Sequence, residues 1–183
     1  MTFRDLLSQR SGLAAFYGED LEVVFLYPRE EVFQRLRYLP PSTLFRIRYA
    51  YFKWNLTLAA ELAARSTAQS WEDMVAQKIY QPLDMRSTVS SKAEFDRAQN
   101  RVSAHQITNG KATYGPFVAR DQQSPAGGVA SNVTDMLHWL AFQADGGRYQ
   151  ARQVVAAEAF QETQTLQTLS SPQFPPAHYG LGA

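Results

Sequence analysis

Residues 51–65 constrain the fold of this chain more than any other stretch. Leucine and alanine recur through it with few polar residues between them, at Leu56, Leu58, Ala59, Leu62 and Ala63. A helix that is apolar on nearly all sides is usually buried by other elements. The sequence therefore predicts a buried helix over 51–65.

Capping residues, prolines and glycines mark further helices on both sides of this stretch. Thr2 and Asp5 resemble a capping box, and Ser70 and Ser131 stand where N-caps are expected. Pro28 suits the first turn of a helix, whereas Pro40 stops one. We expect helices over 2–11, 28–39, 70–81, 131–145 and about 156–166, with a loop over 125–128.

A change of periodicity indicates one small β-hairpin. Residues 101–108 alternate moderately between polar and apolar side chains, and residues 111–117 are rich in β-formers. Asn109-Gly110 lies between them, and Asn-Gly in this position is the strongest short hairpin signal. The predicted fold is mainly α with a hairpin near 101–117. It forms a single helical domain over 1–183, with a partly irregular tail over 167–183.

Composition excludes several classes of function. The chain has no cysteine, so disulfides, thiolate zinc sites and cysteine nucleophiles are excluded, and no compartment is indicated. The net charge is only +1, which argues against nucleic acid and anionic membranes as partners. The longest apolar run is Val23 to Tyr27, far short of the roughly 20 residues of a spanning helix.

The usual catalytic and cofactor motifs are absent from the sequence. A Ser-x-x-Lys nucleophile needs a hydroxyl three residues before a lysine, so that the amine can take its proton. The four lysines are preceded at that spacing by Ala50, Val75, Val89 and Thr108, and the last pair spans the hairpin turn. The three histidines lie far apart, so we expect no metal site, and no glycine pattern suggests a cofactor.

Four segments of the chain, in order, match motifs of one known family. They are TFRDLLSQRSGL (2–13), SWEDMVAQKIYQPLDM (70–85), PAGGVASNVTDMLHWL (125–140) and YGLG (179–182). The first three are similar to "TLRDLLSHTSGL", to a helix ending in "PLGM" and to "PAGG…S…DMARWL", and the fourth is similar to the strand that precedes the family's last motif. The family they resemble is the serine β-lactamase/penicillin-binding-protein-like family, particularly its class C-like esterase branch.

The resemblance implies the helical lobe of a serine hydrolase that acts on esters or amides. Of the family's catalytic elements, the chain contains neither Ser-x-x-Lys nor Lys-Thr-Gly. The Tyr-x-Asn element falls on Tyr51 and on Lys53, a substrate-side position where an ammonium replaces an amide. Tyr51 would assist proton transfer in an intact enzyme, and Tyr49 is a weaker alternative for that role. We expect the chain alone to be inactive.

Ile47, Phe52 and Trp54 form a candidate interaction patch around residues 45–56. Each side chain taken singly also fits a core position, but aromatics beside a cation are typical of binding hot spots. Such a patch would fit a complementing α/β lobe, another protein or a second copy of the chain. The alternative function is therefore a natural or engineered binding scaffold. An independent enzyme with an unrecognised site is a third hypothesis.

Overall fold

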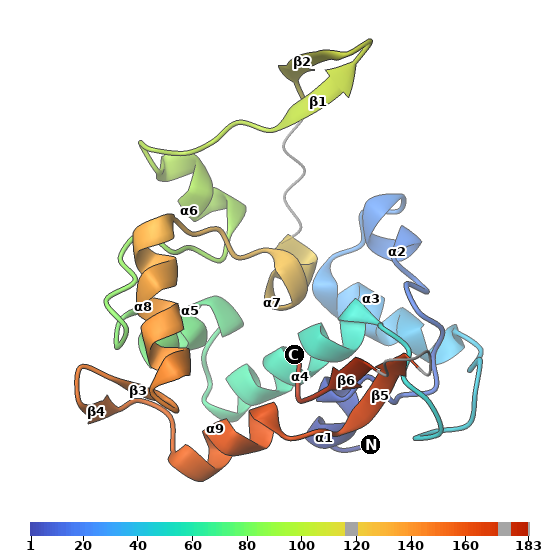
Figure 1. Ribbon diagram of the computed structural model, residues 1–183. Helices are drawn as coiled ribbons and strands as arrows, with labels where there is room; N and C mark the ends of the chain where they lie inside the picture. The colour runs from blue at the N-terminus through green and yellow to red at the C-terminus, as the bar shows by residue number, and fades with distance from the viewer. Residues whose placement is uncertain (116–120, 172–176, 183) are drawn as a thin grey trace.

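The computed structural model describes residues 1–115, 121–171 and 177–182, and the chain is mainly helical, as predicted (Figure 1). Phe117 and the tail prolines, which the sequence placed in the hairpin and in the irregular tail, lie outside the described residues. The helices are α1 (Phe3–Leu7), α2 (Asp20–Val23), α3 (Arg29–Arg35), α4 (Lys53–Ser66), α5 (Trp71–Val75), α6 (Lys92–Arg97), α7 (Ser124–Gly127), α8 (Val133–Ala144) and α9 (Ala157–Gln164). Shorter turns of helix are η1 (Leu36–Tyr38), η2 (Ala76–Tyr80) and η3 (Asp121–Gln123).

Helix α4 confirms the helix predicted over 51–65 and occupies the middle of the molecule, where α1, α5 and α7 contact it (Figure 1). Its buried positions include Trp54, Asn55 and Ala59. Leu62, however, is exposed. One face of the helix therefore reaches solvent, although its composition alone suggested burial on all sides.

The helix boundaries follow local hydrogen bonding. The capping box at Thr2 is present, and the Ser70 hydroxyl accepts the Asp73 N–H at 3.0 Å, both as predicted. Helix α8 differs, because Asn132 rather than Ser131 accepts the Asp135 N–H. The Ser131 hydroxyl is instead 2.8 Å from that of Thr88.

The described residues contain three antiparallel two-stranded sheets rather than one hairpin. The predicted one is present as β1 (His105–Thr108) and β2 (Lys111–Tyr114), joined by Asn109 and Gly110 with φ of 52° and 75°. Positive φ at both positions is what a type I′ turn requires. The others are β3 (Arg148–Tyr149) with β4 (Arg152–Gln153), and β5 (Thr168–Ser171) with β6 (Ala177–Tyr179). The tail, which the fold prediction gave as partly irregular, therefore contains a strand pair, and its second strand ends at Tyr179, the first residue of the segment that resembles a strand of the family.

Two hydrophobic clusters stabilise opposite ends of the helical body. One has Val32, Phe52 and Trp54 at its centre and joins α3 to the start of α4. The other has Tyr80, Leu83, Met85 and Phe142 at its centre and joins η2 to α8. Segment 125–128, expected to be a loop, contributes α7, which packs on α4.

Arg29 links four helices through one largely buried side chain. It donates to the carboxylates of Glu61 on α4 and Glu72 on α5, at 3.1 and 2.9 Å. It also donates to the backbone oxygens of Asp121 and Gln122 and to the Ser124 hydroxyl. These bonds fix the segment before α7 against the central helix.

Candidate functional site

Tyr51 lies directly before α4, where the chain enters the helix in an extended conformation. Its backbone oxygen accepts the Phe16 N–H at 3.1 Å, and the Phe16 ring meets its ring edge-on at 5.6 Å between centroids. The tyrosine is half-buried and lines an open hollow of about 460 Å³. Ser42, Thr43 and Arg48 also line it. Tyr51 therefore forms part of the wall of a hollow that is open to solvent.

Lys53 is the first residue of α4, two positions beyond Tyr51. Its ammonium lies 2.9 Å from Glu19 Oε1, and both side chains are about one quarter exposed, at 23%. It also lies 5.9 Å from the centroid of the Phe16 ring. The predicted substrate-side cation is therefore neutralised by a carboxylate of the same chain.

Tyr49 stacks at an angle on Tyr179 of β6, with 4.9 Å between the ring centroids. Burial raises the pKa of Tyr49 to about 12, and repulsion from ionised Tyr179 and Tyr51 adds to the rise. Burial also raises the pKa of Tyr179, which the nearby Gln9 side chain partly opposes. Both tyrosines are therefore neutral donors at physiological pH.

The candidate interaction patch is wrong in two of its three residues. Phe52 and Trp54 are 1% and 0% exposed, and Trp54 packs edge-on against Phe33 of α3. Only Ile47 is exposed, at 67%. The first turn of α4 turns Phe52 and Trp54 into the cluster with Val32, whereas Ile47 belongs to the loop before it. The core position that each of these two aromatic side chains also fitted in the sequence is therefore the one that it occupies.

An ion pair that the sequence analysis missed anchors the segment bearing Tyr49 and Tyr51. Arg46 donates through Nε and Nη2 to both carboxylate oxygens of Asp5, at 2.7 and 2.9 Å. Asp5 is buried, and its hydrogen bond from Arg46 holds the pKa of its carboxyl far below the ordinary range. In the sequence Asp5 has an evident role as a capping residue, and nothing there points to Arg46.

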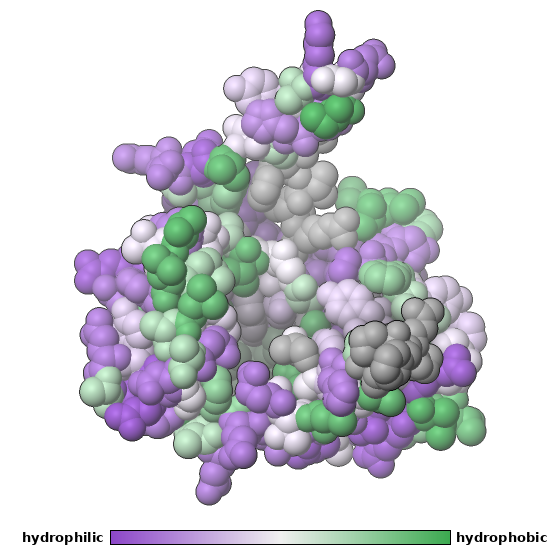
Figure 2. Space-filling view, in the orientation of Figure 1, coloured by the Kyte–Doolittle hydropathy of each residue, from purple (hydrophilic) through white to green (hydrophobic). Residues whose placement is uncertain are grey.

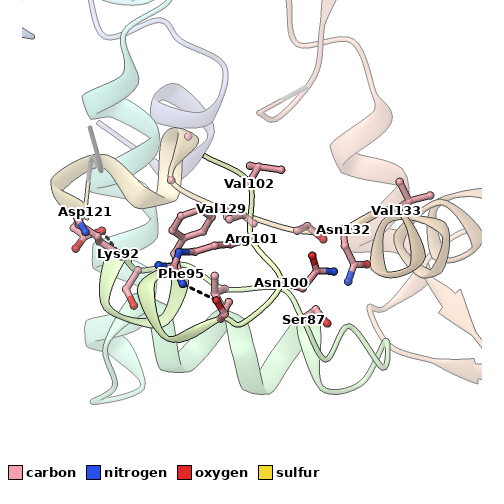
Figure 3. A pocket seen from close by; sticks show the side chains of 17 residues that line it. Ser87, Lys92, Phe95, Asn100, Arg101, Val102, Asp121, Val129, Asn132 and Val133 are labelled. Atoms are coloured by element: carbon pink, nitrogen blue, oxygen red, sulfur yellow. Dashed lines mark hydrogen bonds between the residues drawn. The ribbon is translucent and has the colours of Figure 1, made fainter. Parts of the chain in front are cut away.

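A larger cavity of about 740 Å³ lies between α6 and the start of α8 (Figure 3). Phe95, Val102 and Val129 supply apolar walls, and Arg101 and Asn132 supply polar groups. Lys92, the lysine of the lining, donates a hydrogen bond from its ammonium group to the Asp96 carboxylate rather than to a serine hydroxyl. The lining thus offers room for a small molecule without a nucleophile and base in contact.

The remaining candidates do not assemble into a site. His138 Nδ1 lies 3.2 Å from the backbone oxygen of Asp84, and the His105 ring stacks on the Tyr114 ring. Across the described ranges, no group of three or more histidines and carboxylates is placed to hold a metal ion.

No helix in the described part of the chain is both long and apolar enough to cross a bilayer.

The helical body with its short strand pairs has the architecture of a mainly α part of a β-lactamase-like fold. The protein-family model described as Beta-lactamase matches residues 1–182, and the chain belongs to that family.

Relatives and solved structures agree with this assignment. The D-aminopeptidases of Brucella anthropi and Brucella ovis are 26% and 25% identical over 98% of this chain. The chain spans about one third, 33%, of the length of each relative. The octameric penicillin-binding protein homologue from Pyrococcus abyssi superposes with a TM-score of 0.80 at 20% identity, covering 100% of this chain and 42% of that one.

Two further structures share the fold. A D-stereospecific amidohydrolase from Streptomyces sp. gives a TM-score of 0.79 at 21% identity, over 100% of this chain and 56% of that one. A class C β-lactamase gives a TM-score of 0.71 at 17% identity, and the match covers 99% of this chain and 46% of that one. At these identities the structural likeness concerns the fold.

Proposed function

We propose that this chain forms the tyrosine-bearing helical lobe of a serine hydrolase that transfers acyl groups from esters or amides to water. The observation that carries the proposal is the position of Tyr51, at the start of the central helix and on the wall of an open hollow. Membership of the Beta-lactamase family supports it.

In the proposed reaction Tyr51 moves protons and forms no covalent bond. A serine oxygen attacks the acyl carbon, and its proton passes through the tyrosine oxygen to the departing nitrogen or oxygen. Water then releases the acyl group by the reverse proton path. The chain has no Ser-x-x-Lys, so the serine and its lysine must come from another segment. We infer that the chain alone does not turn over substrate.

The proposed substrate class is amides of D-amino acids. The D-aminopeptidases match 98% of this chain, and the Streptomyces amidohydrolase shares its fold. Lys53 is tied to Glu19, so we infer that it holds segment 13–27 against α4 instead of binding a substrate anion.

A chimaera tests the role of Tyr51. Residues 1–182 would replace the matching segment of the Streptomyces amidohydrolase, and hydrolysis of D-alanine p-nitroanilide would be measured. Tyr51→Phe should lower kcat by at least about 100-fold, the usual contribution of a proton-transfer residue. Tyr49→Phe, matched in chemistry, should stay within a few-fold.

Unchanged turnover of the Tyr51→Phe chimaera, with unaltered thermal unfolding, would refute this role. The lone chain offers a second test by mass spectrometry. A covalent adduct of a mechanism-based acylating inhibitor with any of its hydroxyls would contradict the inference that it houses no nucleophile.

We propose that the partner of this lobe is the α/β part of such an enzyme, docking near exposed Leu44 and Ile47. Leu44→Lys with Ile47→Lys should weaken binding of that part in a titration. A lone chain that instead dimerises in light scattering over a concentration series, and loses dimers in the same variant, would favour self-association.

A further inference from the structure

We propose that Gln9 is a positioning residue that fixes the orientation of Tyr51. The inference rests on the proton-transfer role proposed for Tyr51. Gln9 follows α1, is completely buried, and has a φ of 60°. Residues other than glycine seldom adopt this left-handed conformation, and where they do the strain is often part of a functional site.

Gln9 holds the residues on both sides of Tyr51. Its backbone oxygen accepts the Ala50 N–H at 3.0 Å, and its side-chain oxygen accepts the Phe52 N–H at 3.1 Å. The Phe52 N–H belongs to the planar peptide unit that follows Tyr51, so its bond to Gln9 restricts ψ of Tyr51. The Ala50 N–H belongs to the peptide unit that precedes Ala50, so Gln9 anchors the chain at both ends of the Ala50–Phe52 segment and Tyr51 is held between the two anchors.

The side-chain oxygen of Gln9 also accepts Asn55 Nδ2 at 3.1 Å. Asn55 lies in the first turn of α4, and the N-cap residue Phe52 offers no capping side chain. One buried oxygen therefore ties the first turn of α4 to the strand-like segment that bears Tyr51. The Tyr51 carbonyl is held separately by the Phe16 N–H, which leaves the ring as its movable part.

The contacts define what residue 9 must supply. Methionine fills a similar volume but accepts no hydrogen bond, so Gln9→Met leaves two buried donors unpaired. Glutamate has the same shape and retains an acceptor oxygen, so Gln9→Glu should restore the geometry. Glycine relieves the backbone strain but lacks the side chain, so Gln9→Gly separates the two contributions.

Nuclear magnetic resonance of the full chain, with labelled tyrosine rings and backbone amides, tests the inference. The Tyr51 ring signals are assigned with Tyr51→Phe. In Gln9→Met and Gln9→Gly the Phe52 amide should exchange with solvent at least about tenfold faster, and the Tyr51 ring signals should move. The Ala50 amide, held by the backbone of residue 9, should change less.

Gln9→Glu should return both signals towards wild type, which loss of bulk stability would not explain. Gln123→Met is the matched control, because Gln123 is also buried but its side chain makes no hydrogen bond to the described residues, those beside Tyr51 included. It should leave both signals unaltered.

A folded Gln9→Met chain with unmoved Tyr51 ring signals and unchanged Phe52 exchange would overturn the proposal. If that variant does not fold, Gln9→Gly decides: Tyr51 ring signals and Phe52 exchange that match wild type in a folded Gln9→Gly chain would also overturn it. These readouts report orientation and not turnover. Failure of the catalytic role would appear separately, as an active Tyr51→Phe chimaera.

Discussion

At the scale of single residues, buried polar groups in this chain fall into two kinds. The side-chain oxygen of Gln9 and the carboxylate of Asp5 accept two or more hydrogen bonds each, although the side-chain nitrogen of Gln9 has no partner among the described residues. The side-chain oxygen and nitrogen of Gln123 are buried, and neither has a partner among the described residues. Burial costs free energy unless it is compensated by hydrogen bonds, so the two kinds should respond oppositely to substitution.

We expect Gln123→Met to leave stability unchanged or to raise it by about 1 kcal/mol, because it removes an uncompensated amide. Gln9→Met should instead lower the free energy of unfolding by about 2 kcal/mol, since it leaves buried donors unpaired. Urea unfolding of both variants measures the difference. A strongly destabilised Gln123→Met chain would indicate that this amide has a partner after all.

The Asp5–Arg46 pair predicts a loss of stability in acid. The pKa of Asp5 is lowered by its hydrogen bonds from Arg46, so its contribution is full above the unfolded-state pKa of about 3.9 and is lost as the pH falls towards the lower folded-state pKa. Urea unfolding across the acid range should show this decline.

Asp5→Asn removes the charge, so we expect a loss of about 2 kcal/mol at neutral pH and a flatter acid dependence. Asp84→Asn is the control, because Asp84 pairs with Arg86 at the surface and should cost under about 0.5 kcal/mol. Equal slopes for wild type and Asp5→Asn would refute the assignment.

At the scale of elements, the start of α4 separates core from surface. Trp54 is fully buried and Ile47 is exposed. We expect Trp54→Ala to destabilise the chain by about 3–5 kcal/mol, because it leaves a large cavity. Ile47→Ala should change stability by less than about 0.5 kcal/mol. Thermal and urea unfolding compare the two, and similar losses would contradict the assigned burial.

Helix α8 has two apolar faces, and only one is covered. Trp139 and Phe142 pack inward, whereas Val133, Met136, Leu137 and Leu140 make a stripe visible on the surface of Figure 2. We expect Leu137→Glu with Leu140→Glu to reduce binding of a hydrophobic fluorescent dye. Thr134→Glu, a charge on the same helix outside the stripe, should not. Unchanged dye fluorescence in the double variant would place the accessible apolar surface elsewhere.

Local sequence signals predicted the helix starts and the hairpin better than they predicted which side chains are buried. Capping at Thr2 and Ser70 and the Asn109-Gly110 turn depend on neighbouring residues, so the sequence alone locates them. Which side of α4 faces the core depends on α3 and its Val32, far away in the chain, so the burial of Phe52 could not be read locally. Gln9 lay inside a segment that resembled the family, but only the folded chain brings it to Tyr51.

At the scale of the whole molecule, Arg29 couples parts of the chain that are distant in sequence. Burial would raise the pKa of Glu61, but hydrogen bonds from Arg65 and Arg29 outweigh it and lower the pKa. The Arg29 side chain is 14% exposed, so its two carboxylate partners rely on it for much of the compensation for their own burial. The same group binds the backbone that leads into α7.

Arg29→Met should therefore cost about 3–5 kcal/mol, since it strands two partly buried carboxylates. Neutralising those partners, with Glu61→Gln and Glu72→Gln in the Arg29→Met background, should recover a large part of that loss. The comparison Arg35→Met removes a surface pair with Glu31 and should cost under about 1 kcal/mol. Urea unfolding of the four chains tests the coupling. If the neutralised background is no more stable than Arg29→Met alone, stranded charge is not the cause, and the backbone bonds to Asp121 and Gln122 would have to account for the loss.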